Sequence, residues 1–322
     1  MRLRLVPQDT SWDFFYYAKA TLGASIVAVI LSLVLWITVG LNFGIDFRGG
    51  TTIRTESVQV VDVGAYRDAI APLNLGDISI TEVFDPTFGP ERNVAMLRIQ
   101  AQDGVESVTA DTILAVEAAL QGVDPSITFP SVESVGPKVS GELVRSAVVA
   151  VGLSLAAILF YIWLRFEWQF SVGAVAALFH DVVLTIGIFA AFQIRFDLAT
   201  IAALLTIVGY SINDTVVIFD RVRENLIKYK TKPLRDVMNL SVNETLSRTV
   251  MTSGTTLLAL LALLILGGDV IRGFVFAIFW GVIVGTYSSV YVAKNIVLML
   301  GTKRDWSKPT DNTGNQFANT DP

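Results

Sequence analysis

The stretch ATLGASIVAVILSLVLWITVGL, residues 20–41, is apolar from end to end and carries no charged side chain. A helix needs roughly twenty such residues to cross about 30 Å of hydrocarbon. The stretch is too long for the core of a signal peptide, and it lacks an A-x-A cleavage site. We therefore expect it to be a retained membrane span that sets the class of the fold.

The composition of the whole chain agrees with this expectation. Hydrophobic residues make up 52% and charged residues 16% of the 322 positions, whereas about 25% of residues are charged in soluble domains. The absence of cysteine excludes disulfides and thiol chemistry, and the single histidine, His180, excludes multi-histidine metal sites. Because no Walker A pattern and no large cytoplasmic domain occur, we expect no ATP-driven transport within this chain. We also expect a transport subunit rather than an enzyme, without a cofactor.

Five further apolar runs follow a long segment of ordinary soluble composition. These runs cover residues 144–164, 170–192, 198–219, 250–266 and 271–300. The predicted fold is an α-helical polytopic membrane protein with six spans and one domain between the first two. The predicted units are 1–19 (N-terminus), 20–41 (span 1), 42–142 (outer domain with linkers), 143–302 (spans 2 to 6, with an inner loop at 220–247) and 303–322 (a polar tail, expected to be disordered). The inner loop contains two amphipathic stretches that are compatible with helix, RVRENLIKY and LRDVMNL.

Lysine and arginine counts predict the orientation of the spans. Basic residues gather before span 1, between spans 4 and 5, and after span 6, and six spans place these three segments on the same side. That side is the cytoplasm by the positive-inside rule. The segment between spans 1 and 2 has more acidic than basic residues and falls outside. We therefore predict that both termini are cytoplasmic.

The outer segment reads as a small α/β domain. Alternating apolar residues predict strands at 51–58, 78–84, 94–100 and 126–135, and apolar residues at helical spacing predict helices at 65–73 and 108–120. The order β-α-β-β-α-β is that of the ferredoxin-like fold.

Ionisable residues inside a membrane are costly, so they are candidates for function. Asp181 lies near the centre of span 3, Asp214 lies in span 4 on a polar face with Ser211, and Arg248 opens span 5 on a face with Thr252. The functional hypothesis is an ion path, because burial raises a carboxylate's proton affinity and a movable arginine lowers it. The alternatives are a structural Asp214–Arg248 pair with a snorkelling arginine, a helix-packing hydrogen bond for Asp181, and a packing role for His180.

A glycine-rich motif connects span 1 to the first strand. It contains Gly44, Asp46, Arg48, Gly49 and Gly50. Paired glycines permit backbone conformations that are closed to other residues, which favours a hinge or close packing. An ordinary turn is the alternative.

Several stretches together resemble a known family. They are GIDFRGGT (44–51), VGPKVSGEL (135–143), FHDV (179–182), GYSINDTVVIFDRVREN (209–225) and TLSRTVMTSGTTL (245–257). They closely resemble the SecF family, the smaller subunits of the bacterial SecDF accessory translocase, within the resistance-nodulation-division (RND) superfamily. The resemblance covers essentially the whole chain except the tail.

The resemblance implies a place in the bacterial inner membrane and a partner, SecD, whose six spans complete a twelve-span unit. It implies work with the SecYEG translocon and YajC on translocating preproteins, with ion flow as the energy source and no nucleic-acid partner. It places the family's essential carboxylate at Asp214 and its essential arginine at Arg248. The coupling ion is expected to be H⁺, and Na⁺ stays open because a carboxylate with hydroxyl neighbours suits either ion.

Two other functions stay open at this point. One is a small-molecule or lipid exporter of the same superfamily, which the single outer domain and the lack of a duplicated half disfavour. The other is a purely structural scaffold for SecD, in which Asp214 and Arg248 only stabilise packing.

Overall fold

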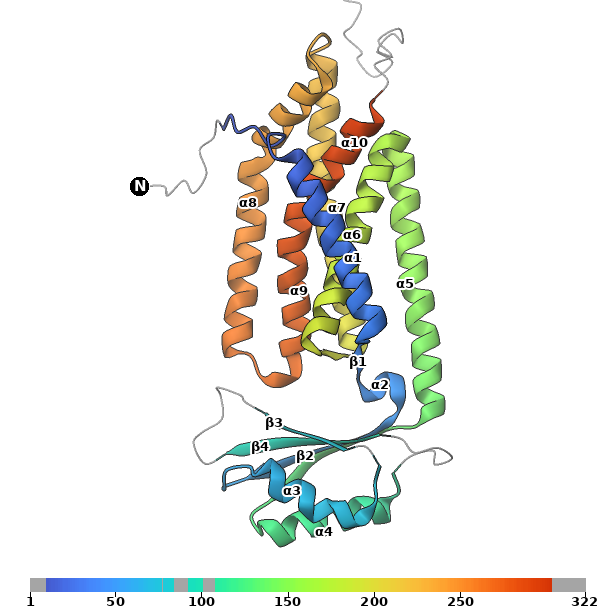
Figure 1. The fold of residues 1–322 in the computed structure, drawn as a ribbon, viewed down its shortest axis with the longest axis vertical. Helices are drawn as coiled ribbons and strands as arrows, with labels where there is room; N and C mark the ends of the chain where they lie inside the picture. Colours follow the sequence, from blue (N-terminus) through green and yellow to red (C-terminus); the bar gives the residue numbers. More distant parts are fainter. Residues whose placement is uncertain (1–9, 77, 84–91, 101–107, 303–322) are drawn as a thin grey trace, which may run out of the picture.

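The computed structural model describes residues 10–76, 78–83, 92–100 and 108–302, and it contains a helical bundle next to an α/β layer (Figure 1). The prediction of six membrane helices is confirmed, because six helices are long and apolar enough to cross a membrane. They are α1 (Ala18–Thr38), α5 (Pro137–Arg165), α6 (Trp168–Phe192), α7 (Leu198–Lys228), α8 (Leu234–Leu266) and α9 (Asp269–Ser288); α9 continues through a π-helical turn, η2 (Ser289–Ala293), into α10 (Lys294–Leu300). The predicted tail at 303–322 lies outside the described residues.

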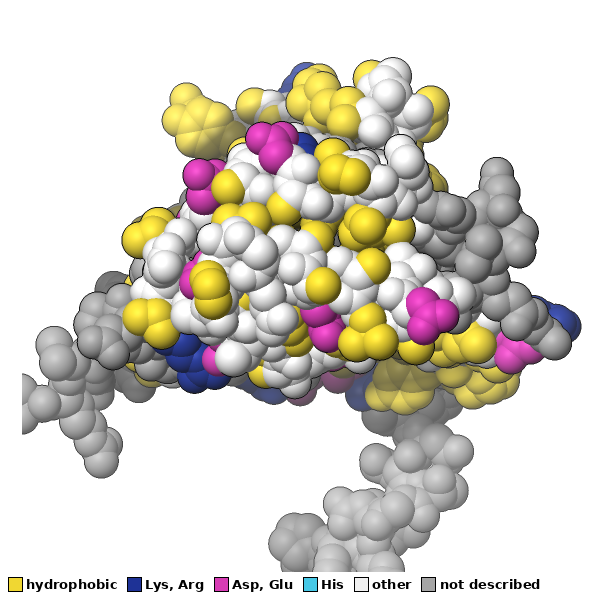
Figure 2. All heavy atoms as spheres, turned by 90° about the horizontal axis from the view of Figure 1, so that it is seen from below, with side chains coloured by type: hydrophobic (Ala, Val, Ile, Leu, Met, Phe, Trp, Pro, Cys, Tyr) yellow, Lys and Arg dark blue, Asp and Glu magenta, His cyan; other side chains and the backbone are white. Residues whose placement is uncertain are grey.

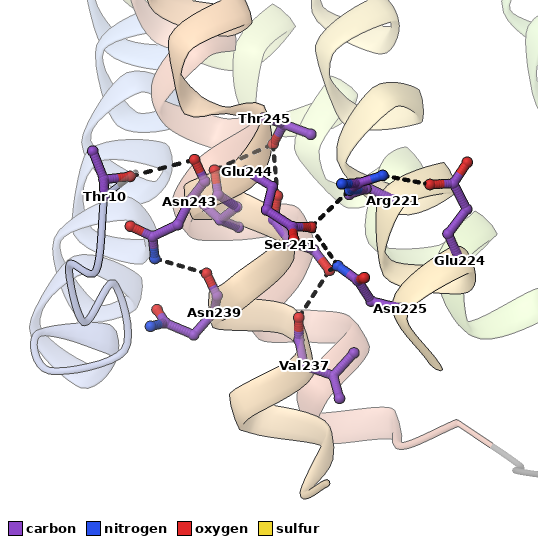
Figure 3. Close-up of polar contacts among 11 residues, drawn as sticks. Thr10, Arg221, Glu224, Asn225, Val237, Asn239, Ser241, Asn243, Glu244 and Thr245 are labelled. Atoms are coloured by element: carbon purple, nitrogen blue, oxygen red, sulfur yellow. Dashed lines mark hydrogen bonds and ion pairs between the residues drawn. The ribbon is translucent and has the colours of Figure 1, made fainter. Parts of the chain in front are cut away.

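Some helices extend beyond the apolar runs that predict them. The segment 220–247 is not a separate loop, because α7 runs to Lys228 and α8 begins at Leu234. Polar contacts hold these extensions together: Arg221 Nε donates to Glu244 Oε2 at 2.7 Å, and Asn225 Nδ2 donates to the same oxygen at 2.6 Å (Figure 3). The stretches RVRENLIKY (221–229) and LRDVMNL (234–240), whose amphipathic pattern is compatible with helix, account for a large part of these extensions.

The outer domain has the predicted ferredoxin-like topology. Its elements are β2 (Gly50–Ser57), α3 (Val63–Ile70) with a 3₁₀ turn η1 (Ala71–Leu73), β3 (Ile78–Val83), β4 (Asn93–Gln100), α4 (Ala110–Val123) and β5 (Thr128–Val135). The strand order is β3-β4-β2-β5 with every neighbouring pair antiparallel. This order is the one that two split β-α-β units produce.

One face of the sheet carries the core of the outer domain. Ile53, Leu97 and Ile99 of the sheet are buried against Ile70 of α3 and Leu120 of α4. The two helices cover the sheet on the side away from the bundle, so the other face of the sheet points toward the membrane helices (Figure 1). The surface of the helical layer shows acidic side chains among hydrophobic and neutral ones, with basic side chains at its margins (Figure 2).

Helices α6, α7 and α9 form the interior of the bundle, while α5 lies at its periphery (Figure 1). Phe170 of α6 and Phe219 of α7 pack edge to face, with their ring centroids 5.0 Å apart, in the largest buried cluster. Among the described side chains of α5, only Ser140 and Ile162 are buried. The apolar surface of α5 therefore requires lipid or another membrane helix around it.

A short junction joins the bundle to the outer domain. Strand β1 (Asn42–Phe43) pairs in parallel with β6 (Arg195–Phe196), and the single-turn helix α2 (Ile45–Arg48) follows it. The carbonyl of Ile45 accepts a hydrogen bond from Ser140 of α5 at 3.1 Å. The chain therefore enters and leaves the outer domain next to the same end of the bundle.

Candidate functional site

Asp214 lies in the middle of the long helix α7, and its side chain points into the bundle. The residue is 2% exposed, and its Oδ2 is buried without a hydrogen-bond partner among the described residues. A buried carboxylate oxygen normally has a partner. The position predicted as an ion-binding carboxylate is thus buried and incompletely satisfied.

Arg248 lies on the neighbouring helix α8, within electrostatic range of Asp214. Its side chain is exposed on the surface of this chain, and no ion pair to it occurs within the described parts of the structure. Among the described residues, Arg248 therefore influences Asp214 electrostatically without an ion pair between the two side chains.

Asp181 of α6 is fully buried and has several hydrogen-bond partners. Its Oδ2 accepts from the hydroxyls of Ser211 at 2.5 Å and Ser288 at 2.8 Å, and its Oδ1 lies 2.9 Å from Nδ1 of His180. These partners come from α6, α7 and α9, so Asp181 connects the three interior helices. The contact with His180 shows that these consecutive residues touch.

The approach of the interior helices depends on a glycine. A Cβ atom added at Gly285 of α9 would lie 3.0 Å from Cβ of Ser211 and 3.5 Å from Oδ2 of Asp181. A side chain at this position would therefore push α9 away from the carboxylate. Close by, the hydroxyls of Thr215 of α7 and Ser289 of the π-helical turn η2 are 2.8 Å apart and continue this polar contact.

Thr252, another predicted site residue, forms its side-chain hydrogen bonds within its own helix. Its hydroxyl donates to the carbonyls of Arg248 and Thr249 in its own helix, at 3.0 Å in each case. Thr256 on the next turn accepts a hydrogen bond from the hydroxyl of Tyr210 at 3.3 Å. The threonine face of α8 thus contacts α7 through Thr256, whereas Thr252 satisfies itself locally.

The glycine-rich motif is anchored on the first turn of α7. Oδ2 of Asp46 accepts from the backbone N–H of Leu198 at 3.1 Å, and the N–H of Gly44 donates to Phe196 O at 2.8 Å. Gly49 has φ 73° and ψ 168°, a region that glycine alone populates readily. The motif therefore links span 1, the first strand of the outer domain and the helix that carries Asp214.

The sequence reasoning overlooked Lys294, which is fully buried at the start of α10. Its Nζ donates to Phe14 O at 3.0 Å and lies 4.0 Å from the ring centroid of Phe15. The rule that singled out the other intramembrane charges would also have found this lysine. Its partners lie at the opposite end of the chain, so their identity could not be read from the pattern.

The N-terminal segment held by Lys294 is also held by α8. The N–H groups of Trp12 and Phe14 donate to the side-chain oxygens of Asn243 and Asn239, both at 2.9 Å. Figure 3 shows these asparagines on α8 beside the segment that contains Thr10.

In the described part of the chain, no group of three or more acidic or histidine side chains gathers that could hold a metal ion.

Comparisons with known proteins agree on one family. A family model described as protein export membrane protein SecD/SecF, C-terminal, matches residues 115–303, and a model of the SecD/SecF GG motif matches residues 34–59. The protein translocase subunit SecF of Cereibacter sphaeroides is 68% identical over 320 residues, which is 99% of each chain. The SecF subunit of Rickettsia bellii is 42% identical over 306 residues, covering 94% of this chain and 97% of that one.

Solved structures give the same result. The crystal structure of SecDF, a translocon-associated membrane protein, from Thermus thermophilus matches with a TM-score of 0.82 and 37% identity over 93% of this chain. SecDF in a super-membrane-facing form matches over the same share with a TM-score of 0.69. In both cases the match covers 40% of the SecDF chain, so this chain corresponds to less than half of that protein.

Proposed function

The chain belongs to the SecD/SecF family as a SecF subunit of protein export, and from this premise we propose that it uses the proton-motive force, together with SecD, to promote late steps of preprotein translocation. These steps take place at the outer side of the SecYEG channel, and YajC is a further expected partner. The chain acts as a non-enzymatic coupling subunit, and H⁺ is the ion that it binds.

The observation that carries this proposal is the state of Asp214. One of its carboxylate oxygens is buried without a hydrogen-bond partner in the described bundle, and Arg248 lies near it without forming an ion pair. A carboxylate in this setting gains proton affinity by burial and loses it when a cation approaches. Movement between the two helices would therefore load and release a proton.

The contact between the glycine-rich motif and α7 supports a function in which ion binding moves the outer domain. Because Asp46 bonds to the first turn of α7, a shift of that helix on ion binding reaches the glycine-rich motif directly. The exposed apolar surface of α5 offers a place where SecD can pack. Asp181 and Ser211 hold the interior helices in register around the path, and Thr252 belongs to the helix that moves with Arg248.

The test is preprotein translocation into vesicles that contain SecYEG, SecD and this chain under an imposed pH gradient. Asp214→Asn should abolish the stimulation by the gradient while SecD still co-purifies. Asp220→Asn is the matched control, because Asp220 lies on the same helix but pairs with Arg165 at 3.0 Å at the exposed end. Stimulation that survives in Asp214→Asn would refute the proton role of this subunit.

The same vesicles separate the rival functions. If Asp214→Asn reduces the amount of SecD that co-purifies with the chain, and translocation falls only to the same extent, the chain is a scaffold. If loss of the chain raises drug accumulation in cells whose secretion is normal, it is an exporter. A sodium gradient that replaces the pH gradient with equal effect would make Na⁺ the coupling ion.

The orientation can be tested directly, because the chain contains no cysteine. A membrane-impermeant thiol reagent should label Gln59→Cys in the outer domain from the outside of intact cells. It should label Thr231→Cys, in the turn between α7 and α8, only after the membrane is opened. The reverse pattern would refute the predicted cytoplasmic termini.

A further inference from the structure

The face of the outer sheet that points toward the bundle is polar. In the printed register, Arg98 of β4 lies opposite Ser79 on one side and Thr52 on the other, and Thr52 lies opposite Glu133. The next row across the sheet is Thr81, Met96, Arg54 and Ser131. Since side chains alternate along a strand, the apolar neighbours of these residues face the helices instead.

A cavity of about 790 Å³ separates this polar face from the outer ends of the membrane helices. The wall formed by the bundle includes Arg195 of β6, Asp197 just before α7, Leu264 near the end of α8, and Phe276 of α9. A volume of this size is typical of sites for small molecules and lipid headgroups. The sheet and the bundle therefore do not pack tightly but enclose a space at the membrane boundary.

Three hydrogen-bond donors that line the cavity lack acceptors. Oγ1 of Thr52, Nε of Arg98 and Nε of Arg195 are all buried without a hydrogen-bond partner in the described structure, and Thr52 is only 6% exposed. Arg195 keeps one longer ion pair, at 3.6 Å, with Asp197. Buried donors without acceptors are uncommon, and these three border the same space.

The two guanidinium groups are electrostatically unfavourable neighbours. Burial lowers the pKa of Arg98, and the positive charge of Arg195 lowers it further, whereas Asp197 and Asp46 oppose the shift. A phosphate or carboxylate between Arg98 and Arg195 would relieve this repulsion and accept from both. We therefore expect an anionic group to bind between Arg98 and Arg195.

The remaining lining residues narrow the class of ligand. Glu133 projects from the same face of the sheet as Thr52, where its carboxylate suits a cationic group, and Leu264 and Phe276 provide an apolar wall on the membrane side. A simple anion would not need the glutamate, and a soluble ligand would not need the apolar wall. A ligand that carries a phosphate, an amine and hydrocarbon chains matches all three parts of the lining.

We propose that this cavity binds the headgroup of a zwitterionic phospholipid of the phosphatidylethanolamine class. The phosphate lies between Arg98 and Arg195 and accepts from Thr52, the ammonium group faces Glu133, and the acyl chains leave along Leu264 and Phe276. The lipid fills the space between the sheet and the bundle and supports the outer domain on the membrane surface.

The test is lipid retention by the purified full-length chain. After incubation with equal amounts of phosphatidylethanolamine, phosphatidylcholine and phosphatidylglycerol, native mass spectrometry counts the lipids bound to each chain. Wild type should retain phosphatidylethanolamine above the other two. Arg98→Gln should lower this retention by about tenfold, because it removes the positive charge and a charge-assisted hydrogen bond to the phosphate. Arg92→Gln is the control, because Arg92 directly precedes β4, the strand that carries Arg98, but its side chain pairs with Glu56. This variant should retain lipid like wild type.

A second variant and two soluble competitors make the result decisive. Thr52→Val keeps the shape of the side chain and removes only the buried hydroxyl, so it should reduce retention even if Arg98→Gln folds poorly. Phosphoethanolamine should displace the lipid better than inorganic phosphate does. Equal retention of all three lipids, unchanged retention in Thr52→Val, or equal displacement by phosphate would each overturn the proposal. Because the assay needs neither SecD nor a gradient, its outcome is independent of the proposed ion coupling.

Discussion

The hydroxyl of Ser211 donates to Oδ2 of Asp181 at 2.5 Å, and Ser211 lies one helical turn before Asp214 on α7. One serine thus lies between two buried carboxylates on neighbouring helices. Asp181 is satisfied by two hydroxyls and a histidine, whereas Asp214 keeps an oxygen without a partner. This difference agrees with the roles proposed above, in which Asp181 holds the helices together and Asp214 exchanges a proton.

Ser211→Ala should weaken ion coupling without removing either carboxylate. The substitution deletes one hydrogen bond to the Asp181 carboxylate, and such a bond contributes roughly 1.5–3 kcal/mol when one group is charged. We expect the gradient-dependent part of translocation to fall about tenfold, while the rate without a gradient stays the same. The measurement is the pH-gradient assay in vesicles described above.

Thr206→Ala is the matched control for this change. Thr206 lies on the same helix as Ser211, but its hydroxyl is exposed and donates at 2.8 Å to Ala202 O in its own backbone. This variant should behave like wild type. If both variants lose the same stimulation, the loss reflects damage to α7 rather than the contact with Asp181.

Gly49→Ala should destabilise the junction between span 1 and the outer domain. Its φ of 73° with ψ of 168° is a conformation that costs a residue with a Cβ roughly 1–3 kcal/mol. We expect a lower midpoint of thermal unfolding and reduced export. Gly122→Ala, in α4 with open space around its Cβ position, should unfold at the same or a slightly higher temperature. A Gly49→Ala variant that unfolds like wild type would show that the junction relaxes to another conformation.

The sequence predicted the spans and the sheet because each leaves a periodic signal over many residues. Long apolar runs marked α1 and α6, and alternation marked β2 and β4. At the ends of α7 and α8 the signal was limited to two short amphipathic stretches, because the contact between Arg221 and Glu244 stabilises the helices outside the apolar region. The contact between Ser211 and Asp181 depends on how two helices rotate against each other, which a single sequence does not specify.

Lys294→Met should release the N-terminal segment from the bundle. The change leaves the carbonyl of Phe14 without its donor and removes the ammonium group from the ring of Phe15. An unsatisfied buried acceptor costs roughly 1–3 kcal/mol, so the backbone amides of residues 10–17 should exchange hydrogen about tenfold faster or more. Hydrogen-exchange mass spectrometry of the full chain measures this directly.

Lys228→Met is the control for Lys294→Met, because Lys228 lies over the ring of Tyr229 at the exposed turn between α7 and α8. It removes a longer lysine–aromatic contact, 5.2 Å to the ring centroid against 4.0 Å for Lys294, without touching the N-terminal segment. Exchange in residues 10–17 should stay at the wild-type rate. If Lys294→Met also leaves that rate unchanged, Asn239 and Asn243 hold the segment without help from the lysine.

The outer domain should lose stability in acid through Asp124. The hydroxyl of Ser57 donates to this carboxylate and lowers its pKa below the ordinary value of 3.8, and the backbone N–H and hydroxyl of Ser126 act in the same direction. A group whose pKa is lower in the folded state stabilises the fold above its ordinary pKa. This contribution is lost as the pH falls through the range below about 3.8.

Pepsin, which is active in acid, should therefore cleave residues 50–135 of the wild-type chain increasingly as the pH falls through this range. Asp124→Asn cannot ionise, so it should be cleaved faster than wild type at pH 5 and should approach the wild-type rate near pH 2. Parallel pH profiles for the two chains would show that Asp124 does not control the acid stability of the domain.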